Sequence, residues 1–476
     1  MFSHTEFGGL YVKIIPRIVI GACQGRSGKT TFTLGLLQAL RQRGIHVQPF
    51  KKGPDYIDPS WLSYAAGKEC RNLDAFMMTK EGLINSFVQN SLEADISIVE
   101  GAMGLFDGLD VEGSGSTAEI AYMLQAPVIL VVNCQRMTRS VAALVNGVVN
   151  FDPRIKIGGV ILNHVARTRH KNMLISSIEK YCQVPVLGYV PKRTEIVIPD
   201  RHLGLIPAGE QEELKETVNR LGQLIEENVN LEELLKIAKQ VTVLESPVRE
   251  DSSGKNTGEV TIGVLRDKVF SFYYPENLDA LRKQGAHLVF IDSLKDKCLP
   301  KVDGLYIGGG FPEMFAQELE ENHDLRREIK KTIEQGLPVY AECGGLMYLG
   351  RSIKKNESVY NMVGALPYDV VMEKKPQGHG YTINKALEGN PFFSPNEEIR
   401  GHEFHNSRVI NLDYSQVRFG MEVKRGKGIT GKEEGILYKN VYAGYSHIHV
   451  ASAPNWARRF VKNALNYQRK SHSVHE

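Results

Sequence analysis

Residues 17–40 read RIVIGACQGRSGKTTFTLGLLQAL: an apolar strand, a glycine-containing turn and the start of a helix in direct succession. A phosphate-binding loop requires this order, because backbone N–H groups at the helix start cradle phosphate oxygens. The residues expected to form the loop are Ser27, Gly28, Lys29, Thr30 and Thr31. Lys29 would reach the β and γ phosphates, and the Thr30 hydroxyl would hold Mg²⁺. Cys23 stands where the usual pattern has a glycine, so the motif is imperfect.

Apolar runs alternate with longer amphipathic stretches around this loop. Buried strands are expected at 17–20, 95–99, 128–132, 158–162 and 184–189, and a charged helix near 226–240. This alternation is typical of a parallel sheet covered by helices on both faces. The fold class predicted for this part is therefore α/β, with a P-loop NTPase-like sheet.

The chain, at 476 residues, is too long for one ordinary core. The stretch 246–259, SPVREDSSGKNTGE, is polar and aperiodic and is interpreted as an interdomain linker. Strand-like runs resume at 260–265, 287–291, 304–307 and 337–341. We therefore expect one domain over residues 1–245 and a second α/β domain over residues 260–476.

Composition narrows the class of protein. The chain is 42% hydrophobic and 24% charged, and its net charge of +3 is not gathered in one block, so neither nucleic acid nor a membrane is expected as a partner. The N-terminus lacks the pattern of a signal peptide, and no apolar run approaches the length of a membrane span, which predicts a cytoplasmic protein. The six cysteines show no paired metal-ligand spacing and are expected as thiols.

Carboxylates follow two of the apolar stretches. KKGPDYIDPSW, residues 51–61, supplies Lys51, Asp55 and Asp58 in a segment whose Gly and Pro residues are taken to exclude a regular element. EGAMGLFDG, residues 100–108, places Glu100 at a strand end and Asp107 in the following loop. Ligands bind beyond the carboxyl ends of parallel strands, so these side chains are candidates for holding Mg²⁺ or a substrate. Ordinary turn formation is the alternative for both segments. GSGST at 113–117 could add anion-binding amides or be a flexible loop.

One cysteine stands on a tight turn between a strand and a helix. The run 337–341 is followed by Cys343, and residues 344–347 open a helix, which exposes the thiol and favours its thiolate. Cys343 is therefore the candidate nucleophile; a small buried core residue is the alternative. A second glycine-rich turn, GGGFPE at 308–313, also follows a strand. The N–H groups of Gly309, Gly310 and Gly344 are candidates for an oxyanion hole.

A nucleophilic thiol needs a base. The candidates are His402, His405, His447 and His449. YSHIH at 445–449 alternates like a strand, which would put His447 and His449 on one face, and either could be the base. The sequence does not identify a third residue that would orient the histidine base.

The chain resembles the cobyrinate a,c-diamide synthases, in which a dethiobiotin-synthetase-like ATPase is fused to a class I glutamine amidotransferase domain. The matching stretches cover nearly the whole chain in order and are SGKTT, VQPFKKGPDYIDPSW, RNLD, VEGAMGLFDG, GVILNHV, RHLGLIP, FSFYYPENLDALRKQGA, DGLYIGGGFPE, AECGGLMYL, RGHEFHNSRV and YSHIH.

The resemblance implies roles for residues at matching positions. Lys29 and Thr30 would bind ATP and Mg²⁺, and Asn163 would read the adenine edge. Asp55, Glu100 and Asp107 would serve metal binding, phosphoryl transfer or substrate positioning, with Thr30, Asp55 and Glu100 as the metal set. Cys343 would be the glutaminase nucleophile, and His447 would raise its nucleophilicity.

The resemblance also implies a reaction. ATP phosphorylates a carboxylate of a modified tetrapyrrole, and L-glutamine supplies ammonia, with two ATP and two glutamines consumed for the a and c carboxylates. A shielded path for ammonia between the domains is expected. The oligomeric state, a homodimer included, stays open.

Three alternatives remain. The first keeps the chemistry on a sirohydrochlorin-type ring, Ni-sirohydrochlorin or sirohaem, and LDVEGSGSTAEIA at 109–121 is longer and more acidic than expected for a cobyrinate enzyme. The second is a non-catalytic P-loop switch ATPase, which does not explain a second domain with AECGG and paired histidines. The third is a dethiobiotin synthetase, which needs no glutaminase domain.

Overall fold

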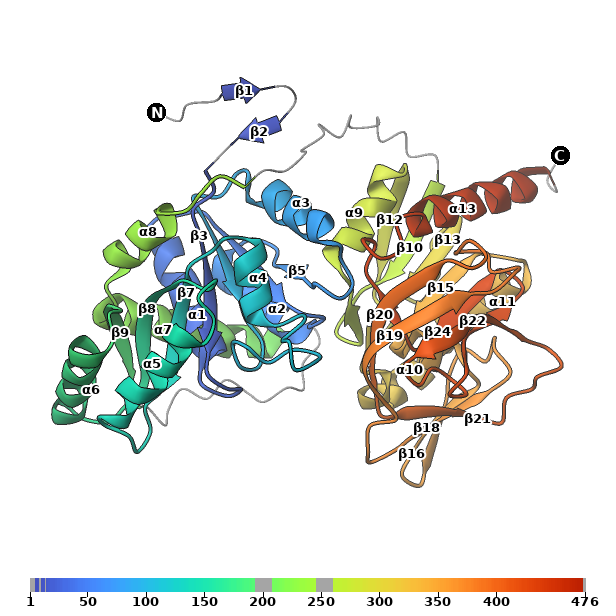
Figure 1. The fold of residues 1–476 in the computed structure, drawn as a ribbon. Coiled ribbons are helices and arrows are strands. Elements are labelled where there is room, and N and C mark those ends of the chain that lie inside the picture. Colours follow the sequence, from blue (N-terminus) through green and yellow to red (C-terminus); the bar gives the residue numbers. More distant parts are fainter. Residues whose placement is uncertain (1–4, 8–9, 13, 193–207, 245–259, 474–476) are drawn as a thin grey trace. The chain divides into compact units, whose positions relative to one another are not determined.

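A computed structural model describes residues 5–7, 10–12, 14–192, 208–244 and 260–473 (Figure 1). The chain divides into two compact units, one made of residues 1–202 and 207–249 and the other of residues 203–206 and 250–476. The segment interpreted as a linker, 246–259, and the RHLGLIP stretch at 201–207 lie outside the described residues.

The first unit is built on one parallel sheet. Its strands are β3 Arg17–Ala22, β4 Val47–Lys52, β5 Arg71–Leu73, β6 Ile96–Glu100, β7 Val128–Asn133, β8 Ile157–Val165 and β9 Val186–Pro191. They pair in the order β5-β4-β6-β3-β7-β8-β9, and every pair is parallel. The predicted parallel sheet is therefore confirmed, with each of the expected strands shifted by at most a few residues. A separate hairpin joins β1 Thr5–Phe7 and β2 Leu10–Val12.

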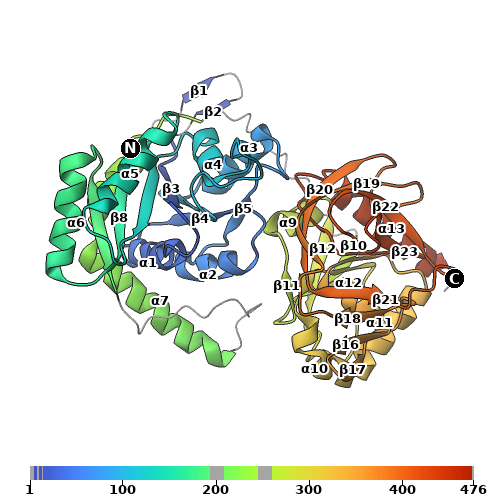
Figure 2. The ribbon, with the colours of Figure 1, turned by 60° about the horizontal axis from the view of Figure 1, so that its bottom comes forward.

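Helices cover both faces of this sheet. They are α1 Lys29–Gln42, α2 Ile57–Ala66, α3 Lys80–Ser91, α4 Thr117–Met123, α5 Ser140–Phe151, α6 Thr168–Tyr181, α7 Ala208–Asn228 and α8 Leu231–Lys239. Figure 2 shows α1, α2 and α7 on one face and α3, α4 and α5 on the other, and α1 packs against both α2 and α7. Apolar side chains of α3 to α6 form one core with those of the strands.

Two expectations for this unit were wrong. KKGPDYIDPSW is not free of regular structure, because β4 continues to Lys52 and α2 begins at Ile57. Pro59 is tolerated because it lies in the first helical turn, where its missing N–H has no partner to lose. The charged helix over 226–240 is interrupted, because α7 ends at Asn228 and the Asn230 side chain caps α8 by accepting from the Glu233 N–H at 3.0 Å.

The second unit contains a sheet whose pairing changes from parallel to antiparallel. Its strands are β10 Val260–Leu265, β12 Ala286–Ile291, β13 Gly304–Ile307, β15 Val339–Glu342, β19 Gly378–Ala386, β20 Glu398–His405, β22 Arg418–Arg425, β23 Glu433–Tyr438, β24 Val441–Gly444 and β25 His447–Ile448. The order is β12-β10-β13-β15-β24-β23-β22-β19-β20-β25. The parallel half, β12 to β24, contains all four strands expected for this unit.

The smaller sheets and the helices complete this unit. The remaining strands are β11 Phe270–Phe272, β14 Gly309–Gly310, β16 Ser352–Lys355, β17 Ser358–Asn361, β18 Asp369–Met372 and β21 Ser407–Ile410. The helices are α9 Pro275–Lys283, η1 Pro312–Met314, α10 Ala316–Glu321, α11 His323–Glu334, α12 Gly344–Leu349 and α13 Trp456–Ser473. Side chains of α10, α11 and α12 form one core with the strands, and those of α9 and α13 form another. Across the part of the chain described, no helix combines the length and the apolar character needed to cross a membrane.

Candidate active sites

The phosphate loop joins β3 to α1 in the first unit. Gly28 adopts φ 92°, and a Cβ at this position would lie 2.0 Å from the Asn163 amide nitrogen, so only glycine fits. The Ser27 hydroxyl donates to the Gln24 carbonyl at 3.0 Å and closes the turn. A Cβ at Gly25 would meet nothing within 4 Å, so this part of the loop borders open space. The loop thus has the strand, turn and helix start that phosphate binding requires.

Lys29 lies at the first position of α1 and is largely buried. Its ammonium donates to the Met103 carbonyl at 2.5 Å, which ties the phosphate loop to the segment after β6. Burial and the nearby Lys51 ammonium lower the pKa of Lys29. An anion beside Lys29 would offset both effects, so its position suits a phosphate group.

A buried ionic cluster lies at the carboxyl ends of β4 and β6. Lys51 donates to Glu100 Oε1 at 2.7 Å and to Asp58 Oδ2 at 2.5 Å. The Thr30 hydroxyl donates to the same Glu100 oxygen at 2.8 Å. Burial lowers the pKa of Lys51, but the Glu100 and Asp58 carboxylates outweigh it and the net shift is upward. The pKa of Glu100 is raised, because burial outweighs the Lys51 charge.

The residues present fit a magnesium ion at this cluster. Glu100 Oε2 is buried and has no hydrogen-bond partner among the described residues, and it belongs to the carboxylate that Thr30 contacts. Within those residues, no group of three His, Cys, Asp or Glu side chains gathers to hold a metal by itself. Mg²⁺ usually binds to one or two carboxylates together with substrate phosphates and water, so an all-protein cage is not needed.

Asp55 and Asp107 border the same region. Asp55 Oδ1 accepts from the N–H groups of Ile57 at 2.8 Å and Asp58 at 3.1 Å at the start of α2. Burial and the Asp58 charge raise the pKa of Asp55 to about 6. Asp107 Oδ2 accepts from the Gly104 N–H at 2.8 Å, in the loop after β6. The structure therefore brings together the loop lysine, Thr30 and the predicted carboxylates.

Asn163 and Thr31 also lie beside the loop. The Asn163 amide donates to the Ser27 carbonyl at 2.8 Å from the end region of β8. This contact positions the phosphate loop, and reading of an adenine edge by Asn163 stays a prediction. Thr31 lies in the first turn of α1 and is half-buried. Within GSGST, Ser116 caps α4 by accepting from the Glu119 N–H at 3.1 Å.

In the second unit, Cys343 stands between β15 and α12. Its backbone has φ 46° and ψ −95°, a strained conformation for a residue other than glycine. Its N–H donates to the Gly444 carbonyl of β24 at 2.7 Å, which holds the turn. The side chain is 6% exposed, and burial, followed by the Glu313 charge, raises the pKa of the thiol. The expectation of an exposed thiol with a favoured thiolate was therefore wrong, because the turn lies inside the fold, where the charged form is disfavoured. This is the tight turn predicted for a nucleophile.

The three glycines proposed for an oxyanion hole meet at this turn. A Cβ built on Gly344 would lie 3.0 Å from the Gly310 nitrogen and 3.4 Å from the Gly309 carbonyl carbon. A Cβ on Gly309 would lie 2.4 Å from His447 Cε1. Gly309, Gly310, Gly344 and the imidazole of His447 therefore surround one place beside the thiol turn.

His447 reaches this place because β24 pairs with β15. Glu342, the last residue of β15, is opposite Gly444, the last residue of β24, so Cys343 and His447 follow neighbouring parallel strand ends. His447 is buried, and burial, with His402 and His405 nearby, lowers its pKa well below the usual value. The imidazole is therefore neutral at physiological pH, as a base must be.

Glu342 is the residue that the sequence interpretation did not identify. Its Oε2 lies 3.9 Å from His447 Nδ1 and accepts from the Tyr306 hydroxyl at 3.1 Å, and its Oε1 accepts from the Ile448 N–H at 3.1 Å. Burial raises the pKa of Glu342 to about 8. The sequence did offer a signal for Glu342, because a carboxyl stands directly before the candidate nucleophile, at the end of a predicted buried strand.

The other histidines lie elsewhere around the site. His402 pairs with His447 across β20 and β25, and their rings stack with centroids 4.9 Å apart. His449 lies 3.5 Å from Glu276 and against the Tyr274 ring. The strand expected over 445–449 was wrong, because β25 covers only His447–Ile448. The Ser446 N–H donates to the Glu434 side chain instead of a neighbouring strand, at 2.9 Å.

Comparison with known proteins matches both units. Residues 18–206 match the family model of the CobQ/CobB/MinD/ParA nucleotide binding domain, and residues 261–455 match that of the CobB/CobQ-like glutamine amidotransferase domain. A cobyrinate a,c-diamide synthase of Magnetococcus marinus is 47% identical over 448 residues, 93% of this chain and 96% of the relative. A protein of the same name from Archaeoglobus fulgidus is 44% identical over 95% of this chain and 98% of the relative. A third protein of the same name, from Methanosarcina barkeri, is 40% identical over 96% of this chain and 97% of the relative.

Proposed function

The chain belongs to the cobyrinate a,c-diamide synthase family of glutamine-dependent ligases, and we propose that it converts the a and c carboxylates of cobyrinate to carboxamides in cobalamin biosynthesis. The observation that carries the proposal is the presence, in one chain, of a phosphate loop beside a buried carboxylate cluster and of a thiol turn beside an imidazole. Neither a switch ATPase nor a dethiobiotin synthetase accounts for the second centre.

The first centre activates the acid. Lys29 and the loop N–H groups bind the β and γ phosphates of ATP, and the substrate carboxylate attacks the γ phosphorus to give an acyl phosphate and ADP. Most of the rate gain in such a transfer comes from positioning and charge neutralisation. Thr30 and Glu100 would hold Mg²⁺, which would supply positive charge at the phosphates. The negative charge that develops on the transferred group is also met by Lys29.

The carboxylates around this centre hold the metal and position the substrate. Lys51 holds Glu100 in place through its bond at 2.7 Å, and the other oxygen of that carboxylate would be available to hold Mg²⁺. Asp55 and Asp107 serve metal binding or substrate positioning from the two loops that border the cluster. Ammonia then attacks the acyl phosphate, the C–O bond to phosphate breaks, and a carboxamide and inorganic phosphate leave.

The second centre releases ammonia from glutamine. His447 takes the thiol proton of Cys343, and the sulfur attacks the side-chain amide carbon. The N–H groups of Gly309, Gly310 and Gly344 stabilise the negative oxygen of the tetrahedral intermediate. The imidazolium returns its proton to the departing nitrogen, leaving a thioester and ammonia. Water, deprotonated by His447, hydrolyses the thioester to glutamate and restores the thiol.

Glu342 acts in this scheme through His447. In its ionised form, which a positive charge 3.9 Å away favours despite the raised pKa, Glu342 stabilises the imidazolium once His447 has taken the proton, and its contacts with Tyr306 and Ile448 fix its orientation. A carboxyl in this position has the orienting role of the acid in a catalytic triad.

The proposal is tested by mass spectrometry of products. The protein is incubated with ATP, Mg²⁺ and glutamine together with cobyrinate, Ni-sirohydrochlorin or sirohaem. We expect two carboxyl-to-carboxamide conversions on cobyrinate and none on the other rings. Amidation of only a sirohydrochlorin-type ring would overturn the substrate assignment, and glutamine hydrolysis that persists in Cys343→Ala would overturn the second centre.

A further inference from the structure

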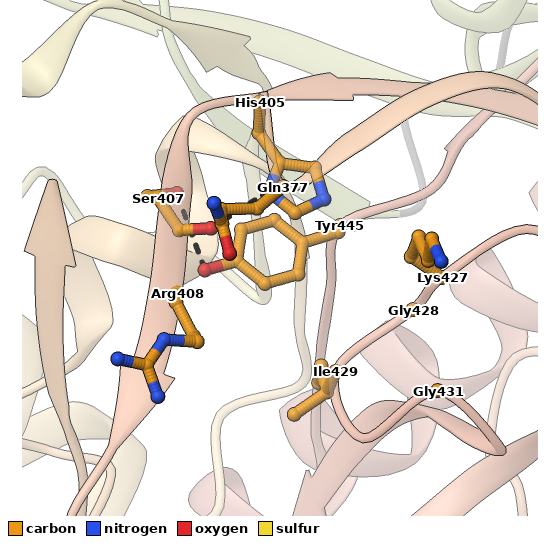
Figure 3. Close-up of a pocket in the computed structure, with 9 residues that line it drawn as sticks. All are labelled: Gln377, His405, Ser407, Arg408, Lys427, Gly428, Ile429, Gly431 and Tyr445. Carbon is orange, nitrogen blue, oxygen red and sulfur yellow. Dashed lines mark hydrogen bonds between the residues drawn. The ribbon is translucent and has the colours of Figure 1, made fainter. Parts of the chain in front are cut away.

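β20 carries two buried histidines that take no part in the reaction steps above. His405 is the last residue of this strand and lines a cavity of about 160 Å³ in the second unit (Figure 3). Its ring stacks on that of Tyr445 with centroids 3.6 Å apart, and its Nδ1 donates to the Ser407 carbonyl at 2.8 Å. His405 is thus held in the wall of the cavity. His402, three residues earlier on the strand, has the base His447 as its neighbour.

His402 and His447 are direct partners in the sheet. They are opposite each other where β20 pairs with β25, and the side chains of opposite residues lie side by side on one face. The two imidazoles are nearly parallel, with an angle of 16° between their planes and ring centroids 4.9 Å apart. Gly309 borders the same imidazole, because a Cβ there would lie 2.4 Å from His447 Cε1. The His447 ring is therefore bordered by the His402 ring and by the Gly309 backbone.

His402 is itself held in one orientation. It is 5% exposed, and the Tyr274 hydroxyl forms a hydrogen bond of 3.3 Å with its Nδ1. Tyr274 is fully buried at the N-cap of α9. In that helix, Asn277 Nδ2 donates to the Ile448 carbonyl at 2.9 Å, and its Oδ1 accepts from the Val450 N–H at 2.7 Å. The helix that places Tyr274 is thereby fixed to the segment that carries the base.

The charge state of His402 suits a support for the base. Burial lowers the pKa of His402 to about 3, so its ring is neutral at neutral pH. When His447 takes the thiol proton in the proposed reaction, only one of the two stacked rings is charged. The face of a neutral aromatic ring attracts a cation, whereas a second imidazolium would repel it.

We propose that His402 is a positioning residue of the glutaminase centre, which holds the His447 imidazole in the plane where it can reach the thiol of Cys343. His402 acts through His447 and need not touch glutamine. The support comes from the flat ring, and the Tyr274 hydroxyl sets the orientation of that ring. The inference rests on the proposed function, because it requires that Cys343 cleave glutamine with His447 as the base.

The test measures steady-state glutamate release by the full-length protein. His402→Ala removes the supporting ring, and kcat should fall roughly 10- to 100-fold with KM for glutamine unchanged, because a misplacement of about 1 Å at a reacting group costs about 100-fold in rate. His402→Phe keeps a flat ring against the base and should recover most of that loss. A side chain that only fills the core would change thermal stability and leave kcat as it is.

A second variant keeps the test decisive if His402→Ala fails to fold. Tyr274→Phe keeps both rings and removes only the hydroxyl, so kcat should fall roughly 2- to 10-fold with KM unchanged, since one hydrogen bond contributes about 0.5–1.5 kcal/mol. His323→Ala is the matched control, because it removes an exposed histidine of α11 whose Nδ1 lies 2.9 Å from Arg326, and it should change neither constant.

Three results would overturn the inference. They are an unchanged kcat in both His402→Ala and Tyr274→Phe, an effect confined to KM, and an equal fall of kcat in His402→Phe and His402→Ala. Absence of glutaminase activity in the unmodified protein would instead overturn the proposed function.

Discussion

Gly309→Ala should disable the glutaminase centre by displacing its base. The new Cβ would lie 2.4 Å from His447 Cε1 and 3.2 Å from Nε2. Carbon atoms in contact are about 3.5–4.0 Å apart, so the imidazole must retreat by more than about 1 Å. Gly309 is not among the positive-φ glycines, so alanine introduces no backbone strain there and the effect is steric.

The expected loss follows from that displacement. A misplacement of about 1 Å at a reacting group costs roughly 100-fold in rate, or about 2.7 kcal/mol of transition-state stabilisation. Glutamine-dependent amidation and glutamine hydrolysis should both fall by this factor. Amidation supplied with ammonium chloride should be unchanged, because the first centre is untouched.

The assay is steady-state glutamate release, run beside ammonia-dependent amidation of the tetrapyrrole. Gly147→Ala is the matched control, because a Cβ at this exposed helical glycine meets nothing within 4 Å. Glutamate release within a few-fold of the unmodified protein in Gly309→Ala would refute the reasoning. Equal loss of the ammonia-dependent reaction would show a folding defect instead.

The remaining predictions concern buried charges and a helix. Glu342→Gln should lower glutaminase kcat roughly 10- to 100-fold with KM for glutamine unchanged, since the side chain acts, once ionised, only on the imidazolium formed during reaction; a change confined to KM would contradict this role. Burial raises the pKa of Glu434 to about 8, above the ordinary value of 4.5, so the folded state holds this proton more tightly than the unfolded state does. The contribution of Glu434 to the free energy of unfolding is therefore fully present below pH 4.5 and is lost as pH rises through about 8, by up to about 1.4 kcal/mol per pH unit. Glu434→Gln should remove this contribution, so thermal stability should depend less on pH between these two values. Lys51→Met leaves the Glu100 and Asp58 carboxylates without their buried cation and should destabilise the first unit by about 3–5 kcal/mol at neutral pH in denaturant unfolding; a loss below about 1 kcal/mol would mean that the cluster is hydrated. Gly147→Ala should itself stabilise the first unit by about 0.5–1 kcal/mol, which the same unfolding measurement checks.

Structural features that depend on residues close together in the sequence could be predicted. The phosphate loop and the thiol turn each consist of a strand, a few residues of turn and a helix start, so residues near one another in sequence determine them. The parallel strands also followed from local apolar runs. β4 was noted only as an apolar stretch before Lys51 and was not predicted as a strand, because Gln48, Pro49 and Lys51 interrupt its pattern, although the structure buries Gln48 and Lys51 with hydrogen-bond partners.

Features that depend on distant segments could not be predicted. The position of Glu342 beside His447 arises from the pairing of β15 with β24, and the contact of Asn163 with Ser27 arises from the order of β3, β7 and β8. The placement of His447 beside Gly309, with His449 against Tyr274, depends on the same long-range packing. The strands in the antiparallel half of the second sheet lack a clear alternation of apolar and polar residues, so the sequence did not predict them.

The nucleophile and its base come from strands that are neighbours in the sheet but far apart in the chain. A ribosome releases the segment with Cys343 well before the segment with His447, because synthesis runs from the N-terminus. An unfinished copy therefore carries a thiol with no imidazole beside it, and so does any fragment that ends before β24. Under the proposed function, such incomplete molecules would not hydrolyse glutamine, because the thiol would lack the base that takes its proton.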